Sequence, residues 1–423
     1  MIAFCGLSHL GIVSSVCAAE KGFTVICYDP NESRISDLKL EKLHVHEPKL
    51  DELLQKNKSK ITFTSTASDI SGCDIVTISP DVKTNDQNTA DLTELNQLID
   101  TMQPHLGRKA TVVTLSQLPP GFSNQLVSTK FKSISFYCQV ETLIFGRAVE
   151  RALFPERYMI GCANPKNALP EAYSKYLSAY GCPIVPMKYT SAELCKISIN
   201  LFLVSTVSTT NMIAEICEKS GADWNEIAPA LKLDKRIGHY AYLSAGLGIS
   251  GGNLERDLIA IRKLSRELGT DAAIVDDWLV NSSYRKDWPF RVLCESVLSK
   301  KNQPVIGVLG LAYKQDTKSI KNSPSIELIK KLSSYDVIAY DPQVLLSEHD
   351  GYLQVKQVQS ASEVLASSDA VVIMTPWGEF SQIDLNTIAT LKVKTIIDPY
   401  GILISKVNRK NINYFSMGVS HES

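Results

Sequence analysis

Two polar side chains four residues apart have the chemistry to act on the oxygen of an alcohol. Lys196 and Asn200 fall within a long apolar segment of helical periodicity, so they share one helical face, and Glu193 lies one turn before them. A lysine ammonium and an amide that point into a closed site stabilise negative charge that develops on oxygen. This pattern favours alcohol oxidation, and we expect all three side chains to converge on one atom.

A turn near the N-terminus has the pattern of a dinucleotide-binding unit. Gly6 and Gly11 lie between a predicted strand and a predicted helix, Ser8 stands where a further glycine is usual, and Asp29 ends the next predicted strand. Backbone N–H groups at the helix N-terminus would hold the pyrophosphate. Asp29 would accept hydrogen bonds from ribose hydroxyls and repel a 2′-phosphate, which predicts NAD as the cofactor. We expect Ser8 either to donate to a phosphate or to weaken cofactor binding.

The elements that position these residues indicate an α/β protein. Short apolar runs alternate with amphipathic segments in the first half, which predicts parallel βαβ units, and strands resume near the C-terminus after a long helical stretch. We predict two Rossmann-like doubly wound domains joined by a helical central domain, with bounds 1–189, 190–300 and 301–423. A strand ends in Tyr-Asp-Pro in both halves, at 28–30 and 340–342, which is a hint of internal duplication.

The composition favours a small-molecule partner. The 423 residues include 44 Lys and Arg against 45 Asp and Glu, so the basic surplus of a nucleic-acid-binding protein is missing. The ten cysteines are scattered without a Cys-x-x-Cys pair, which predicts neither a metal site nor a disulfide framework. The sequence shows neither a leader pattern nor an unbroken apolar run of the roughly 18–20 residues that a membrane span needs. We therefore expect a cytoplasmic protein without a membrane partner.

Several segments together resemble the UDP-glucose/GDP-mannose dehydrogenase family. The matching segments occur in the family's order at 6–11, 47–54, 116–121, 193–215, 236–257, 310–324 and 377–380. The resemblance implies an NAD-dependent redox enzyme that acts on a nucleotide-diphospho-sugar and assembles as a homodimer or higher homo-oligomer. The apolar character of the helix around 197–216 on more than one face agrees with such an interface.

The resemblance also assigns site residues. The catalytic positions are Lys196, Asn200, Asp257 and Asn253. The cofactor positions are Gly6, Ser8, His9, Leu10, Gly11, Asp29, Arg34, Pro80, Gln117 and Lys321. The substrate positions are Glu141, Leu143, Lys196, Asn200, Arg236, Tyr242, Gly248, Gly252 and Lys314.

The sequence departs from the family pattern at the chemical centre. Asn253 stands where the family has the nucleophilic cysteine that captures an aldehyde and carries it to a thioester. An amide nitrogen is not a useful nucleophile, so we expect no covalent catalysis at this position. Gln117, Phe145 and the pair 321–322 also differ from the pattern. Cys195 adjoins Lys196 but points about 100° away from it on a helix, and we expect it in the core.

Three functions remain open from the sequence. The first is a single reversible hydride transfer on a nucleotide sugar, either as net oxidation or as oxidation and re-reduction that inverts a carbon. The second is full oxidation to a uronic acid, with water attacking the bound aldehyde directly. The third is a non-catalytic homologue that binds NAD or a nucleotide sugar.

Overall fold

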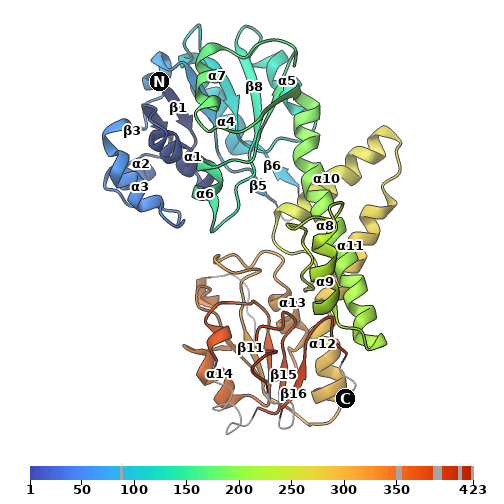
Figure 1. Cartoon of the computed structure of the whole chain (residues 1–423). Coiled ribbons are helices and arrows are strands. Elements are labelled where there is room, and N and C mark those ends of the chain that lie inside the picture. The colour runs from blue at the N-terminus through green and yellow to red at the C-terminus, as the bar shows by residue number, and fades with distance from the viewer. Residues whose placement is uncertain (86–88, 349–354, 384–392, 408–411, 421–423) are drawn as a thin grey trace. The chain divides into compact units, whose positions relative to one another are not determined.

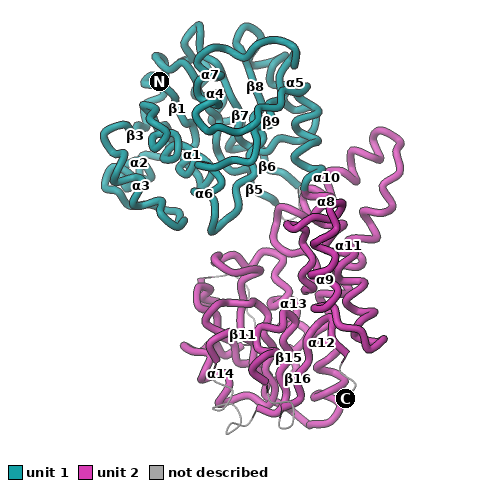
Figure 2. Tube along the Cα trace, viewed as in Figure 1, with its two compact units in different colours: residues 1–199 teal, residues 200–423 magenta. Residues whose placement is uncertain are grey.

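The structure is a computed structural model that describes residues 1–85, 89–348, 355–383, 393–407 and 412–420. These residues form two compact units, 1–199 and 200–423 (Figure 2). The boundary falls inside helix α8 (Tyr189–Ser220), so the chain passes from one unit to the other without a loop.

The first unit is built on a mostly parallel sheet (Figure 1). Its order is β10-β9-β8-β7-β4-β1-β2-β3, in which β8 and β9 are antiparallel and the other neighbouring pairs are parallel. The strands are β1 (Ile2–Cys5), β2 (Val25–Tyr28), β3 (Ile61–Thr64), β4 (Ile75–Ile78), β7 (Thr111–Thr114), β8 (Ser135–Val140), β9 (Tyr158–Cys162) and β10 (Ile184–Lys188), with a separate hairpin of β5 (Lys83–Thr84) and β6 (Ala90–Asp91).

Helices cover both faces of this sheet because its strands are apolar on both sides. In β1, Ile2 and Phe4 enter one core, whereas Ala3 and Cys5 enter the other. The first core also receives α1 (His9–Glu20), α2 (Glu32–Lys39), α3 (Leu50–Asn57), α6 (Ala148–Leu153) and α7 (Glu171–Ser178). The second receives α4 (Thr93–Met102) and α5 (Phe122–Thr129).

The second unit begins with helices and ends with a parallel sheet. Its first helices are α9 (Trp224–Leu233), α10 (Asn253–Leu268), α11 (Ala273–Lys286) and α12 (Trp288–Leu293). The sheet order is β13-β12-β11-β14-β15-β16, formed by β11 (Ile306–Leu309), β12 (Val337–Tyr340), β13 (Lys356–Gln357), β14 (Ala370–Ile373), β15 (Thr395–Ile397) and β16 (Asn413–Phe415), with α13 (Pro324–Lys331) and α14 (Ala361–Ser367) beside it. The predicted α/β fold with a helical middle is confirmed, whereas the three domain bounds stay a prediction.

The two Tyr-Asp-Pro segments occupy equivalent places in the two sheets. Asp29 follows β2 and accepts the Leu7 N–H at 2.8 Å, and Asp341 follows β12 and accepts the Leu311 N–H at 2.6 Å. The glycine before each leucine has a positive φ, which is +88° at Gly6 and +96° at Gly310. The two sheets therefore share the three-residue segment and also a strand, a glycine turn and a carboxylate that accepts from that turn, which favours internal duplication.

Candidate active site

The turn between β1 and α1 requires glycine at two positions. Gly6 has a left-handed φ of +88°, and a Cβ there would lie 2.9 Å from Cδ of Pro80. A Cβ on Gly11 would lie 2.0 Å from the carbonyl oxygen of Gly6, so only glycine allows α1 to approach the turn this closely. The turn thus brings the N-terminal amides of α1 to the carboxyl edge of the sheet, where dinucleotides bind in folds of this type.

Asp29 lies beside this turn and is bound by its own chain. Its Oδ2 accepts the Leu7 N–H and the Nη1 of Arg34, both at 2.8 Å, and its Oδ1 accepts the Asn31 N–H at 3.0 Å. The carboxylate is buried, whereas a third of the Arg34 side chain is exposed. The structure therefore brings together the predicted cofactor residues Asp29 and Arg34, with the arginine compensating the carboxylate charge.

The start of α1 is held by a residue that the sequence analysis did not select. The Leu10 N–H donates to Oδ2 of Asp81 at 3.2 Å. Ser8 accepts the Asp81 N–H on its hydroxyl at 2.7 Å, and that hydroxyl also lies 3.3 Å from the carbonyl oxygen of Ser79. Asp81 directly follows Pro80 at the end of β4, a position that the rule of ligand binding at carboxyl strand ends would have indicated.

His9, at the first position of α1, faces a buried carboxylate and an aromatic ring. Its Nε2 lies 2.8 Å from Oε1 of Glu47, and its ring centroid lies 4.2 Å from that of Phe145. Glu47 also accepts the N–H group of Gly146, two residues before α6, and that of Ala148, the first residue of α6. Phe145, one of the departures from the family pattern, is thus packed at the cofactor turn.

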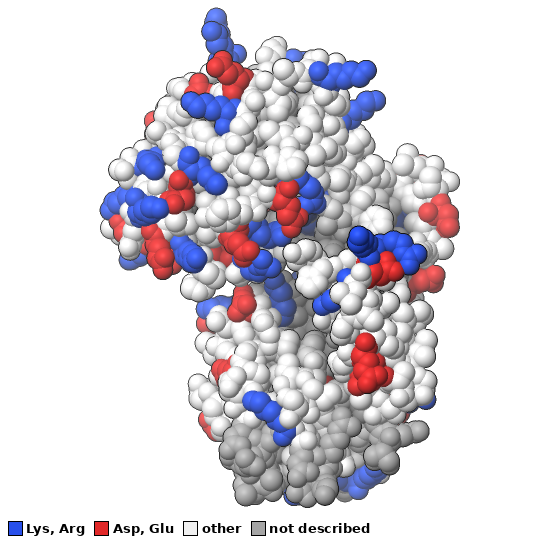
Figure 3. All heavy atoms as spheres, in the orientation of Figure 1, with Lys and Arg blue, Asp and Glu red and all other residues white. Residues whose placement is uncertain are grey.

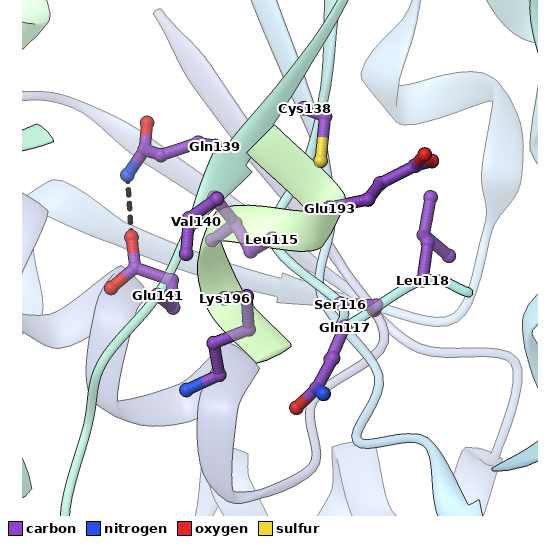
Figure 4. A pocket seen from close by; sticks show the side chains of 10 residues that line it. All are labelled: Leu115, Ser116, Gln117, Leu118, Cys138, Gln139, Val140, Glu141, Glu193 and Lys196. Atoms are coloured by element: carbon purple, nitrogen blue, oxygen red, sulfur yellow. Dashed lines mark hydrogen bonds between the residues drawn. The ribbon is translucent and has the colours of Figure 1, made fainter. Parts of the chain in front are cut away.

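A small cavity of about 20 Å³ lies where β7, β8 and α8 meet, with about the room of one water molecule. Figure 4 shows Lys196 and Glu141 extending on the same side of this cavity, with Gln117 nearby. The full set that lines it is Leu115, Ser116, Gln117, Leu118, Cys138, Gln139, Val140, Glu141, Glu193 and Lys196. Three predicted site residues from separate segments therefore meet at one point.

Glu141 is held and tuned by its neighbours. Withdrawal from water raises its pKa to about 7, while the hydrogen bond from Gln139 and the charge of Lys196 act in the opposite direction. Gln139 donates from Nε2 to Oε1 of Glu141 at 2.5 Å and accepts the hydroxyl of Tyr173 at 2.9 Å. Gln139 was not among the predicted site residues, although its place two residues before Glu141 predicts the same face of a strand.

The expectation that Glu193 converges with Lys196 is wrong. Its carboxylate accepts the N–H groups of Gly121 and Ser123, at 2.6 and 2.7 Å, and so caps the N-terminus of α5. In Figure 4 the Glu193 carboxylate points away from the Lys196 ammonium. Both residues lie on α8, but the Glu193 carboxylate is hydrogen-bonded to the N–H groups at the start of α5 and not to Lys196.

Cys195 lies in a small apolar cluster, as expected. Its sulfur is 3.3 Å from that of Met159.

In the second unit, the remaining predicted catalytic residues lie on α8 and α10. Asn200 donates from Nδ2 to Oδ2 of Asp257 at 2.5 Å, and Asp257 is buried. Arg256 donates from Nε to Oδ1 of Asp257 at 3.3 Å. Asn253 is the first residue of α10, one turn before Asp257, and its side chain is exposed. The structure therefore places Asn253 and Asp257 on one face of α10.

The loop before Asn253 has a glycine-dependent shape. Gly248 and Gly251 have φ values of +69° and +81°, and a Cβ on Gly251 would lie 2.7 Å from the Tyr313 ring. Asn322 donates from Nδ2 to the carbonyl oxygen of Gly251 at 3.1 Å and also to Glu255. Gly252 precedes α10 as its N-cap. Asn322, seen at first only as a departure from the family, therefore fixes the loop that presents Asn253.

The other predicted substrate and cofactor residues are less enclosed. Arg236 is highly exposed and forms an ion pair with Asp234 at 2.7 Å, and Tyr242 is half exposed. Lys314 lies 5.9 Å from the centroid of the Tyr313 ring. The backbone N–H of Lys321 donates to Ser319 at 3.3 Å, and Leu143 packs against a core of the first unit.

Comparison with known proteins shows the family of this chain. Three family models match in order: the NAD binding domain of the UDP-glucose/GDP-mannose dehydrogenase family at residues 1–177, its central domain at 190–282 and its UDP binding domain at 307–405. The chain is 32% identical to a UDP-glucose 6-dehydrogenase of Rickettsia bellii, over 99% of both chains. It is 30% identical to the UDP-glucose 6-dehydrogenase TuaD of Bacillus subtilis, over 99% of this chain and 93% of that one.

Solved structures agree with these matches. A UDP-glucose dehydrogenase from Pyrobaculum islandicum superposes with a TM-score of 0.84 at 25% identity, covering 99% of this chain and 97% of the other. A UDP-D-ManNAc dehydrogenase from Pyrococcus horikoshii has the same fold, with a TM-score of 0.85 at 23% identity over the whole of both chains.

The fold and the glycine turn define a dinucleotide-binding α/β protein. The chain belongs to the UDP-glucose/GDP-mannose dehydrogenase family of NAD-dependent nucleotide-sugar dehydrogenases. NAD is therefore the cofactor, and the UDP binding domain indicates a nucleotide-sugar substrate. Gly6, Gly11 and Asp29 fit NAD, because they form the close backbone approach and the carboxylate that its pyrophosphate and ribose need.

Two surface features bear on other partners. The face drawn in Figure 3 intermixes basic and acidic side chains, as the balanced composition predicts. By length and composition alone, α8 could cross a membrane, since an 18-residue window has a mean hydropathy of 1.4, which the sequence analysis did not anticipate. The family's central domain begins within this helix, at residue 190, so most of α8 belongs to that domain.

Proposed function

We propose that this protein oxidises one hydroxyl of a nucleotide-diphospho-sugar by a single hydride transfer and forms no acyl-enzyme intermediate. The observation that carries the proposal is Asn253, an exposed amide at the start of α10, at the position that the sequence resemblance assigns to the family's nucleophilic cysteine. Lys196, Asn200 and Asp257, which suit alcohol oxidation, are retained. The chain keeps the groups for the first oxidation and lacks the group that captures its product for a second.

The thiols beside Lys196, in its cavity or in the sequence, do not replace the missing cysteine. Cys138 lines the same cavity as Glu141 and Lys196, but burial raises its pKa to about 12, so its thiol stays protonated at neutral pH. The sulfur of Cys195 faces Met159 within an apolar cluster. Neither residue supports a thioester route.

The proposed chemistry balances within the residues of the site. When bound, NAD supplies the acceptor for the hydride of the carbinol C–H bond. Glu141 accepts the hydroxyl proton as a carboxylate, because a pKa of about 7 leaves about half of it ionised near neutral pH. Lys196 stabilises the alkoxide oxygen as the C=O bond forms. In the second unit, the hydrogen bond to Asp257 fixes the orientation of the Asn200 amide. The product is a carbonyl compound that has lost two hydrogens.

The proposal assigns the remaining predicted residues to substrate. Arg236 and Lys314 are basic groups suited to the diphosphate, since a guanidinium donates two parallel hydrogen bonds to a phosphate. Arg236 is nine-tenths exposed, so its guanidinium has space to accept such a partner in place of Asp234. Four uncharged residues would shape the substrate-binding surface without adding charge: Leu143, Tyr242, Gly248 and Gly252.

We also propose a cytoplasmic homodimer. Phe202, Met212 and Ile216 are at least half exposed and recur at helical spacing on α8. Such a stripe of large apolar side chains on a family central domain suits burial against a second copy. Sedimentation at micromolar concentration should give twice the mass of the 46.7 kDa chain, and Phe202→Glu should shift the protein toward monomer.

The test of function is turnover of a panel of UDP- and GDP-sugars with NAD, followed by NADH absorbance and product NMR. Single-hydride chemistry predicts either NADH with a carbonyl product or, if the same hydride returns to the other face, a new stereoisomer without net NADH. A uronic acid with two NADH per sugar would contradict the proposal. Binding of both ligands without turnover would instead support a non-catalytic homologue.

A further inference from the structure

The N-terminus of α1 already holds a carboxylate of its own chain. Amides at the start of a helix lack helical acceptors and attract anions, which is why a pyrophosphate binds there. In this chain, Asp81 accepts the Leu10 N–H through Oδ2 at 3.2 Å. The first turn of α1 contains no acidic residue, and Ser8, its N-cap, makes no side-chain cap hydrogen bond. The anion that meets these amides therefore comes from the segment after β4.

Ser8 holds that carboxylate in place. Its hydroxyl accepts the Asp81 backbone N–H at 2.7 Å and lies 3.3 Å from the carbonyl oxygen of Ser79. A glycine at position 8 would offer neither contact. The serine in the glycine motif and the aspartate after Pro80 thus form one paired feature, which we call the Ser8–Asp81 clasp.

We propose that the Ser8–Asp81 clasp competes with the pyrophosphate of NAD for the N-terminus of α1, so that both residues set the cofactor affinity. A carboxylate and a pyrophosphate cannot share the same amide, because they exclude each other sterically and repel each other electrostatically. Asp81 is exposed and opens the segment that leads into β5, so its side chain has solvent on one side to move into. This inference concerns binding alone and stands apart from the reaction proposed above.

The charge of Asp81 is tested by calorimetric titration of the full-length protein with NAD and with ADP-ribose, neither of which requires turnover. Asp81→Asn should bind both ligands about five- to twentyfold more tightly than the native chain, the range expected for removing a charge at a helix terminus. Adenosine, which lacks the pyrophosphate, should bind both proteins equally. Asp37→Asn, an exposed carboxylate on α2 in the same unit, is the matched control and should leave all three affinities unchanged.

The pairing is tested with Ser8→Gly. This variant should also tighten NAD and ADP-ribose binding, and the double variant with Asp81→Asn should gain less than the product of the two single effects, because both changes release one clasp. Thermal unfolding of each variant reports whether the fold is retained. If Ser8→Gly does not fold, Ser8→Ala takes its place, because it also removes the hydroxyl. Unchanged or weaker ADP-ribose binding by a folded Asp81→Asn protein would overturn the proposal. An equal gain for adenosine would overturn it as well, since the effect would then not involve the pyrophosphate.

Discussion

Asn200 donates a 2.5 Å hydrogen bond from α8 to the buried carboxylate of Asp257 on α10. The bond fixes the amide orientation and supplies a donor to a charge that water does not reach. The hydrogen bond therefore stabilises the second unit and also orients an amide that the proposed alcohol oxidation uses.

Asn200→Ala should lower the free energy of unfolding by about 1–3 kcal/mol, because a buried carboxylate loses one of its hydrogen-bond donors. Urea unfolding followed by circular dichroism measures this change. Lys263→Ala, an exposed change on α10, the helix that carries Asp257, is the control and should stay within about 0.5 kcal/mol of the native chain. Equal stability of the two variants would show that the Asn200 hydrogen bond contributes nothing to the fold.

Lys196→Ala should reduce hydride transfer by a factor of about 10² or more, since the group that stabilises the alkoxide is removed. NADH formation under single-turnover conditions measures the step directly. Lys188→Ala removes an exposed lysine just before α8 and should have no effect. Undiminished transfer in Lys196→Ala would remove this residue from the mechanism.

The rate of hydride transfer should rise with pH through about 7. The raised pKa keeps Glu141 protonated below that pH, and only its carboxylate accepts the substrate proton. Replacing Gln139 with Leu removes the donor that favours the charged form, so the inflection should move to higher pH. A profile whose inflection is identical in native and Gln139→Leu proteins would contradict the role of this hydrogen bond.

The same pKa shift affects stability. Because the folded chain holds the Glu141 proton up to a pH of about 7, against 4.5 for the ordinary carboxyl, its contribution to stability is complete below about 4.5 and is lost as the pH rises toward 7. The Glu141→Gln variant should lack this loss. Unfolding free energies of the two proteins at several pH values measure the difference, and parallel curves would show that Glu141 titrates normally.

Asn253→Cys alone should not restore uronic acid formation, because Gln117 lines the cavity beside Lys196 and Phe145 packs on His9, and both differ from the family pattern. Thiol labelling of residue 253 confirms that the new cysteine is accessible, as its exposed position predicts. Two NADH per sugar from this single variant would show that the flanking changes are neutral.

Local spacing made part of this site predictable. Helical periodicity placed Lys196 and Asn200 on one helix, and the strand, turn and helix around Gly6 required the observed glycine conformations. These features depend on residues within one or two elements, so the sequence shows them directly.

The contacts that were missed join distant segments. Glu193 caps α5 about 70 residues away in the chain, and Asp81 reaches Leu10 across 71 residues. A local sequence pattern indicates neither contact, because each one depends on how the helices pack against the sheet. The wrong expectation for Glu193 came from helical spacing alone, without the competing amides of α5.

The most direct test of the single-hydride account is the ratio of NADH formed to sugar consumed at completion, with excess NAD and with mass analysis of the product. The account predicts at most one NADH per sugar, with a product that has lost two hydrogens without gaining oxygen or that is an isomer of the substrate. Two NADH per sugar with a product that has gained oxygen would contradict it.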